Sequence, residues 1–174
     1  DAHTDLLEKR LGIDLCFGTW TSHIIPFLSS SEHLIQIGIR SSGKDKYFWE
    51  KKFGHKQIWT DEIIKAGASS IASDIVQHLK KLQVEELYVS FDIDCLDQEY
   101  AGATGTPEPK GLEPHAPMVI LQELHENFKI TGADIVEIAP FVKHPEIKSI
   151  EPQTTLMVAQ SFATFFLQAM YGHH

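Results

Sequence analysis

Residues 87–97 constrain the fold more than any other stretch, because a buried-strand pattern runs there directly into two carboxylates. Leu87 to Phe91 is rich in β-branched and aromatic residues, which is typical of a strand covered on both faces in a parallel sheet. Asp92 and Asp94 follow at the predicted carboxyl end of this strand, where open α/β sheets bind ligands. Because side chains two residues apart point the same way along a strand, both carboxylates can converge on one point.

The Asp92–Asp94 pair has two interpretations. Two anions this close repel each other unless a cation or a proton lies between them, and a metal ion meets that need. The alternative is an ordinary turn, since strand ends that run into turns also favour Asp.

The first five residues form a second group of candidate ligands. Asp1, His3 and Asp5 stand at alternate positions, so an extended segment presents all three on one side. Carboxylate and imidazole ligands without thiolates suit Mn²⁺, Mg²⁺ or Zn²⁺, and bridging carboxylates favour a paired-metal site. The alternative interpretation is a polar tail.

Three motifs together resemble the arginase, agmatinase and formimidoylglutamase family of ureohydrolases. They are DAHTD at 1–5, SFDIDCLDQEYAGATGTPEPKGL at 90–112, and DIVE at 134–137 with Pro140. The middle motif is the most specific, because its Asp-x-Asp is followed by Gly-Thr-Pro and Gly-Leu at spacings that rarely arise by chance. The resemblance spans nearly the whole chain.

The resemblance implies a three-layer α/β sandwich with a mainly parallel sheet, of the arginase and deacetylase kind. In that family DAHTD closes a strand inside the sheet, and an earlier Gly-Gly-x-His segment supplies another ligand. We therefore expect the amino-terminal strands to be absent here. Residues 1–171 are then the carboxyl-terminal part of one ureohydrolase-like domain, and 172–174 are expected to be a tag remnant.

The resemblance also implies a binuclear Mn²⁺ hydrolase acting on a guanidino or formimino carbon. Asp1 and Asp92 would bridge the two metals, with Asp5 on one metal and His3 and Asp94 on the other. Further roles follow from the same resemblance. Asp94 would accept a hydrogen bond from the attacking hydroxide, Glu137 would orient the cationic substrate group, and Thr106 would contact the substrate. The alternatives are an ordinary surface role for Glu137 and a turn before Pro107 for Thr106.

Two departures from the family pattern affect catalysis and specificity. Phe17 stands where relatives carry a shuttle His, and His23 is the nearest substitute; the alternative for His23 is a surface or helix-capping role. Leu7 stands where arginases need a polar side chain, which favours substrates without an α-carboxylate. We rank agmatinase first, then formimidoylglutamase, then arginase.

Arg40 is a candidate for binding an anionic substrate tail. It follows a predicted strand at 33–39, and a guanidinium can grip a carboxylate with two hydrogen bonds. The alternative is an exposed loop arginine.

Periodicity and capping residues predict the remaining elements. Helix 60–82 carries an apolar stripe at spacings of three and four, and it is the expected crossover of a right-handed β–α–β unit. The other expected elements are helical segments at 22–28, 115–128 and from 151 onward, and strands at 56–59 and 132–138.

Composition narrows the classes of partner. A net charge of −9 argues against nucleic acid, and no apolar run approaches the ~18 residues of a membrane span. Cys16 and Cys95 lie in no metal or redox spacing, so we expect a reducing, cytoplasmic location. We also expect a homo-oligomer with a small-molecule substrate. The competing hypothesis is a metal-poor homologue that acts as a structural or binding subunit.

Overall fold

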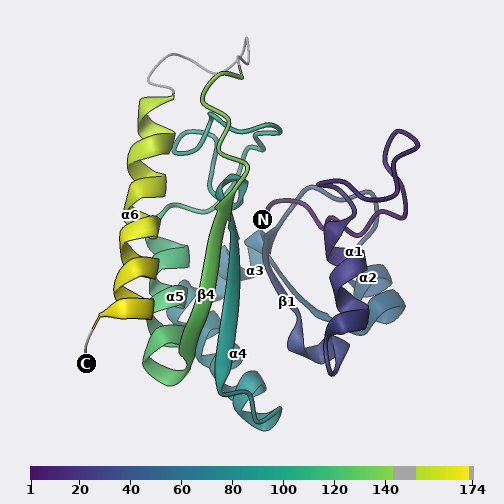
Figure 1. Cartoon of the computed structure of the whole chain (residues 1–174), viewed down its shortest axis with the longest axis vertical. Coiled ribbons are helices and arrows are strands. Elements are labelled where there is room, and N and C mark those ends of the chain that lie inside the picture. The colour runs from purple at the N-terminus through teal and green to yellow at the C-terminus, as the bar shows by residue number, and fades with distance from the viewer. Residues whose placement is uncertain (143–151, 173–174) are drawn as a thin grey trace.

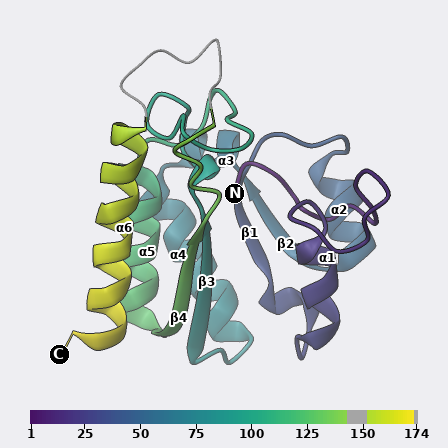
Figure 2. The same ribbon diagram turned by 45° about the horizontal axis from the view of Figure 1, so that its top comes forward.

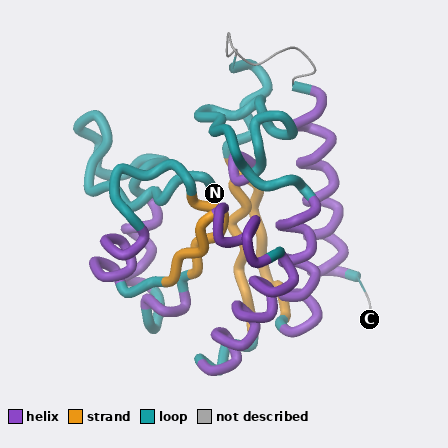
Figure 3. Tube along the Cα trace, turned by 180° about the vertical axis from the view of Figure 1, so that it is seen from behind, coloured by secondary structure: helices purple, strands orange, loops and turns teal. Residues whose placement is uncertain are grey.

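Parallel strand pairs flanked by helices form the architecture of the chain (Figure 1). The computed structural model describes residues 1–142 and 152–172. Figure 3 shows the strands at the centre, with helices around them. The α/β class with parallel strands, as the sequence predicts, is confirmed. The paired strands are β1 (Ile35–Ile39) with β2 (Lys56–Trp59), and β3 (Glu86–Asp92) with β4 (Lys129–Val136).

The helices agree with most of the predicted segments. No helix within residues 1–142 or 152–172 is both long and apolar enough to cross a membrane. The predicted start of the last helix at residue 151 lies outside the described residues, as do residues 173–174 of the predicted tag remnant. The helices are α1 (Trp20–Ile24), α2 (Lys46–Phe53), α3 (Thr60–Ala66), α4 (Ala68–Lys81), α5 (His115–Asn127) and α6 (Gln153–Tyr171), with 3-10 turns η1 (Ile25–Phe27), η2 (Ser31–His33) and η3 (Ile93–Cys95).

Within the described residues the strands pair as two two-stranded parallel sheets, consistent with a mainly parallel sheet whose amino-terminal strands are absent. Figure 2 shows the β1–β2 pair beside the β3–β4 pair. A mostly apolar cavity of about 630 Å³ is lined by residues of both β1 and β3. The amino-terminal ammonium of Asp1 also borders this cavity, and it donates to the Ile37 carbonyl at 3.2 Å. The edges of β1 and β3 thus face a cavity, not each other.

The predicted helix at 60–82 is two helices. Gly67 separates α3 from α4 with φ +85°, a conformation that favours glycine, and its N–H donates to the Ile63 carbonyl. At the start of α3, the Trp59 N–H donates to the Glu62 carboxylate at 2.7 Å. The Thr60 hydroxyl donates to the Gly38 carbonyl at 2.6 Å, which ties this helix to β1. The apolar stripe continues across Gly67, so periodicity alone did not reveal the break.

The connection between the sheets also differs from the expected β–α–β unit. The α3–α4 segment follows β2 and leads to β3, but these strands belong to different sheets. The units that join paired parallel strands are β1–α2–β2 and β3–α5–β4. The α3–α4 segment therefore connects the two halves of the fold.

The main core lies between the β3–β4 sheet and the helices α4, α5 and α6. Phe91, at the end of β3, stacks on Phe162 of α6 with ring centroids 4.2 Å apart, and Phe166 approaches it edge-on. Since Phe91 precedes Asp92 directly, this packing fixes the strand end that carries the candidate ligands.

Buried polar side chains of β1, of β2 and of the residue just before β2 form a hydrogen-bonded network. His55 Nε2 is 3.0 Å from the Gln36 side-chain oxygen, which also accepts from the Gln57 amide at 2.8 Å. Burial lowers the pKa of His55 to about 4. The imidazole is therefore neutral in the folded chain at neutral pH.

Truncating Phe162 should destabilise the fold strongly. We expect Phe162→Ala to lower the free energy of unfolding by about 3–5 kcal/mol, because it removes a ring that is 1% exposed and stacked on Phe91. Met157→Ala on the same helix, at an exposed position, should change it by no more than about 0.5 kcal/mol. Urea denaturation measures both; equal effects would contradict the assigned packing.

Acid should destabilise the fold through His55. Its folded pKa of about 4 lies below the ordinary value of 6.5, so the unfolded chain binds more protons between these pH values and stability falls as pH drops through that window. Between pH 7 and 4.5 the unmodified protein should lose up to about 2 kcal/mol more than a His55→Gln variant. Urea denaturation at each pH tests this, and parallel curves for the two proteins would refute it.

Candidate metal centre

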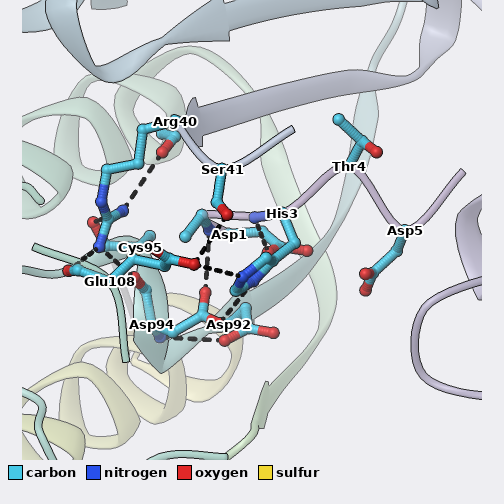
Figure 4. Close-up of polar contacts among 12 residues, drawn as sticks. Asp1, His3, Thr4, Asp5, Arg40, Ser41, Asp92, Asp94, Cys95 and Glu108 are labelled. Carbon is cyan, nitrogen blue, oxygen red and sulfur yellow. Dashed lines mark hydrogen bonds and ion pairs between the residues drawn. The ribbon is translucent and has the colours of Figure 1, made fainter. Parts of the chain in front are cut away.

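Asp1, His3 and Asp94 converge on one point (Figure 4). One potential ligand atom from each residue lies within 4.8 Å of the other two. Among the described residues, this trio is the group of side chains that could hold a metal ion. Asp1 and His3 come from the first segment of the chain, whereas Asp94 lies in η3, directly after β3. Residues more than 90 positions apart therefore form one donor set.

The Asp94 carboxylate is the best-satisfied group of the cluster. It is 1% exposed; one oxygen accepts the Ala2 N–H at 2.8 Å and the other lies 2.9 Å from His3 Nδ1. Burial alone would raise its pKa, but the hydrogen bonds from His3 and Ala2 outweigh burial and lower it. The same contact with Asp94 is the main cause of the raised pKa of His3.

Asp92 is a second buried carboxylate beside Asp94. It accepts the Asp94 N–H at 2.9 Å, and it lines the same cavity as Asp1. Burial, with the charge of Asp94 next, raises the pKa of Asp92 to about 8. The protein's own groups therefore leave one of the two carboxylates without a compensating positive charge. A hard divalent cation with oxygen and imidazole ligands fits this donor set.

Asp5 lies apart from the trio. Its carboxylate accepts from the Trp20 indole N–H at 2.9 Å, its backbone has φ +50°, and burial raises its pKa to about 6. The preceding carbonyl, that of Thr4, accepts from the Gln36 amide at 2.6 Å. Asp5 is thus held on the same segment as Asp1 and His3, with its side chain oriented by α1.

The first segment is fixed from the opposite side by the end of β1. The Ala2 carbonyl accepts from the backbone N–H groups of both Arg40 and Ser41 at 2.9 Å, and His3 forms a parallel bridge with Ser41. Backbone hydrogen bonds of this kind place the candidate ligands without using their side chains.

Arg40 directly follows β1, as the sequence predicts, and its side chain contacts the chain's own carbonyls. Its half-buried guanidinium donates to the carbonyls of Asp94, Cys95 and Leu96 at 2.9–3.1 Å. It also donates to the carbonyls of Glu108 at 2.7 Å and Pro109 at 3.1 Å. Because the protein's own carbonyls occupy these donors, the geometry favours a role in organising the loop over the predicted contact with a substrate anion.

Glu137 and the loop that carries Thr106 lie together. A Cβ placed on Gly105 would stand 3.0 Å from a Glu137 carboxylate oxygen, and Thr104 bridges to Ile138. Glu137 has φ +62°, and Thr106 is exposed. The exposed Thr106 and the partly exposed Glu137 are therefore accessible to a ligand.

His23 contacts a loop carbonyl. It is exposed on α1, and its Nε2 is 2.9 Å from the Asp14 carbonyl. Phe17, in the expected shuttle position, has the Arg10 guanidinium 4.6 Å above its ring. The observed contact of His23 is that of a loop-capping histidine, and a shuttle role for it gains no support from this geometry.

Three residues around the site escaped the sequence analysis. Glu108 lies 3.4 Å from His3 Nε2, Ser41 donates to Glu108 at 2.7 Å, and Trp20 donates to Asp5. The signal that could have drawn attention to Glu108 was its position in the long Gly/Pro-rich loop after Asp94, since such loops are usually functional.

Comparison with known proteins agrees with this geometry. The family model described as Arginase family matches residues 1–167. The chain is 32% identical over 143 residues to the mitochondrial guanidino acid hydrolase of Homo sapiens, which covers 80% of this chain and 40% of that protein. It is 31% identical over 147 residues to the agmatinase of Bacillus anthracis, which covers 84% of this chain and 47% of that protein.

Solved structures give the same result. The proclavaminate amidino hydrolase of Streptomyces clavuligerus matches 99% of this chain and 55% of its own, with a TM-score of 0.78 and 27% identity. The agmatine ureohydrolase of Thermoplasma volcanium matches 98% of this chain and 53% of its own, with a TM-score of 0.79 and 25% identity. The chain spans about half the length of these relatives. Because the family model matches residues 1–167, this chain belongs to the arginase family.

Proposed function

We propose that this protein is a metal-dependent hydrolase that cleaves a guanidino carbon–nitrogen bond. The observation that carries the proposal is the convergence of Asp1, His3 and Asp94, with ligand atoms within 4.8 Å, in a chain of the arginase family. Relatives named guanidino acid hydrolase and agmatinase support the guanidino group as the target.

The donor set suits two Mn²⁺ ions. Asp1, His3 and Asp94 would hold one ion and Asp5 the other, and the buried Asp92 would contribute its carboxylate beside Asp1. Such ions supply Lewis acidity, which lets water act as a nucleophile near neutral pH. The raised pKa of Asp92 supports this assignment, because a buried carboxylate beside another carboxylate needs a positive charge to stay ionised.

The chain's own residues would then orient the reacting groups. The Asp94 carboxylate, fixed by the Ala2 N–H and His3, would accept a hydrogen bond from the attacking oxygen. Glu137 would pair with the planar cation of the substrate, and its location beside Gly105 brings Thr106 of the same loop close to that substrate. The leaving nitrogen departs as an amine, with urea as the second product.

An agmatine-like substrate ranks first. Leu7 is 41% exposed and offers no hydrogen bond to an α-carboxylate, so arginine is disfavoured. Formimidoylglutamate ranks second, and its product would be formamide. The cytoplasmic location and homo-oligomeric assembly expected from the sequence stay predictions.

Removing Asp94 should abolish metal-dependent activity. We expect urea release by the protein with Mn²⁺ to stop on adding a chelator, and Asp94→Asn to lower it by more than the roughly 100-fold that outer ligand partners cost. Asp74→Asn, an exposed acid on α4, is the matched control and should leave the rate unchanged. Activity that survives both chelation and Asp94→Asn would exclude this mechanism.

A substrate panel tests the specificity. Urea release should be fastest with agmatine, slower with 4-guanidinobutyrate and slowest with arginine, while formamide release reports on formimidoylglutamate. Faster turnover of arginine would reverse the ranking. If the protein binds no Mn²⁺ in calorimetry and turns over none of the four compounds, the structural or binding subunit becomes the better account.

A further inference from the structure

The two ring nitrogens of His3 face different carboxylates. Nδ1 lies 2.9 Å from Asp94 and 3.7 Å from Asp1, within the candidate metal cluster. Nε2, across the ring, lies 3.4 Å from an oxygen of Glu108 (Figure 4). Glu108 therefore contacts His3 from the side away from the converging ligand atoms.

Glu108 is itself held in place by the end of β1. The carboxylate oxygen that faces His3 also accepts from the Ser41 hydroxyl at 2.7 Å. Its backbone carbonyl accepts from the Arg40 guanidinium at 2.7 Å. Because Arg40 also bonds the Asp94 carbonyl, one side chain connects the residues on both sides of His3.

The loop that carries Glu108 is anchored at its base. Leu96 and Leu112 form a parallel bridge, and the Gly111 N–H donates to the Asp97 carboxylate at 2.9 Å. The position of Glu108 is thus fixed by several bonds outside the ligand cluster. A carboxylate held this firmly can orient an imidazole ring.

A histidine that binds a metal through one nitrogen needs the proton on the other. A hydrogen bond from that second nitrogen to a carboxylate fixes the ring orientation, places the proton there and makes the free nitrogen a better donor. His3 and Glu108 have this arrangement, with Nδ1 toward the cluster and Nε2 toward Glu108.

We propose that Glu108 is a positioning residue for His3: its contact with Nε2 holds the imidazole ring so that Nδ1 stays turned toward Asp1 and Asp94, with Ser41 and Arg40 fixing Glu108 in turn. The expected effect on Mn²⁺ binding rests on the proposed metal-dependent function, but the contact between Glu108 and His3 can be measured without any metal. Glu108 thus supports the metal centre from outside it, as a carboxylate that touches neither metal nor substrate.

The first measurement is Mn²⁺ affinity, by calorimetry on the protein and its variants. Glu108→Ala should weaken binding about 10- to 100-fold. Glu108→Gln should weaken it less, because the amide oxygen still accepts a hydrogen bond, and it serves as the conservative variant should Glu108→Ala fail to fold. Glu99→Gln, an exposed acid in the same loop, is the control and should bind as the unmodified protein does.

The second measurement is solvent exchange of the His3 Nε2 proton in the metal-free protein, by ¹⁵N-resolved NMR, with the signal identified by its loss in His3→Asn. Exchange should be about ten-fold or more faster in Glu108→Ala than in Glu99→Gln, because the Glu108 carboxylate, 3.4 Å from Nε2, shields this proton from solvent. Equal exchange in these two variants would overturn the proposal, even where Mn²⁺ binds.

The two measurements separate this proposal from the proposed function. If the unmodified protein binds no Mn²⁺ but the proton exchanges faster in Glu108→Ala, the contact stands and the metal-dependent function fails. If Glu108→Ala abolishes Mn²⁺ binding as completely as Asp94→Asn, Glu108 is a ligand and its positioning role is wrong. If Glu108→Ala binds Mn²⁺ as tightly as Glu99→Gln does, the positioning role is also wrong.

Discussion

The site depends on the Asp94 carboxylate, which links the first segment of the chain to the 3-10 turn after β3. A carboxylate that is 1% exposed is costly to bury unless it is paired and hydrogen-bonded, and both requirements are met here by the first three residues of the chain. The Ala2 N–H and the His3 ring come from a segment more than 90 residues away in sequence. The contacts that hold the first segment against η3 are thus the same contacts that assemble the donor set.

Arg40 stabilises the long irregular loop after Asp94 by donating hydrogen bonds to its carbonyls. A loop of this length leaves many backbone carbonyls without a helix or sheet partner, and buried carbonyls need donors. The planar guanidinium supplies several donors in a fixed fork, and it binds carbonyls from both ends of the loop at once. Arg40 thereby fixes Glu108 relative to Asp94, which explains how an irregular segment can orient a histidine.

β1 and β3 face a cavity of about 630 Å³, so no ladder of backbone hydrogen bonds joins the two halves within the described residues. The halves are connected instead by the α3–α4 segment, by Asp94 and by the Arg40 guanidinium. Asp1 and Asp92, two of the candidate ligands, line this cavity.

The sequence alone determined the local elements and the chemistry of the ligands. The apolar run before Asp92 predicts β3, the spacing of Asp92, Asp94 and the first-segment acids predicts a cation site, and the motifs predict the family, since each signal lies within a few residues. The break at Gly67 was missed because the apolar stripe runs through it.

The motifs predict that Asp1, His3 and Asp94 share one site, but only the tertiary structure decided how the surrounding residues meet it. It brings together Asp1, His3 and Asp94, orients Asp5 toward Trp20, and sets His23 against a loop carbonyl. It also turns Arg40 inward and brings Glu108 to His3. The physical reason is that these contacts join positions up to about 100 residues apart, and hydrogen bonds between distant segments leave no periodic or local pattern in the sequence by which they could be predicted.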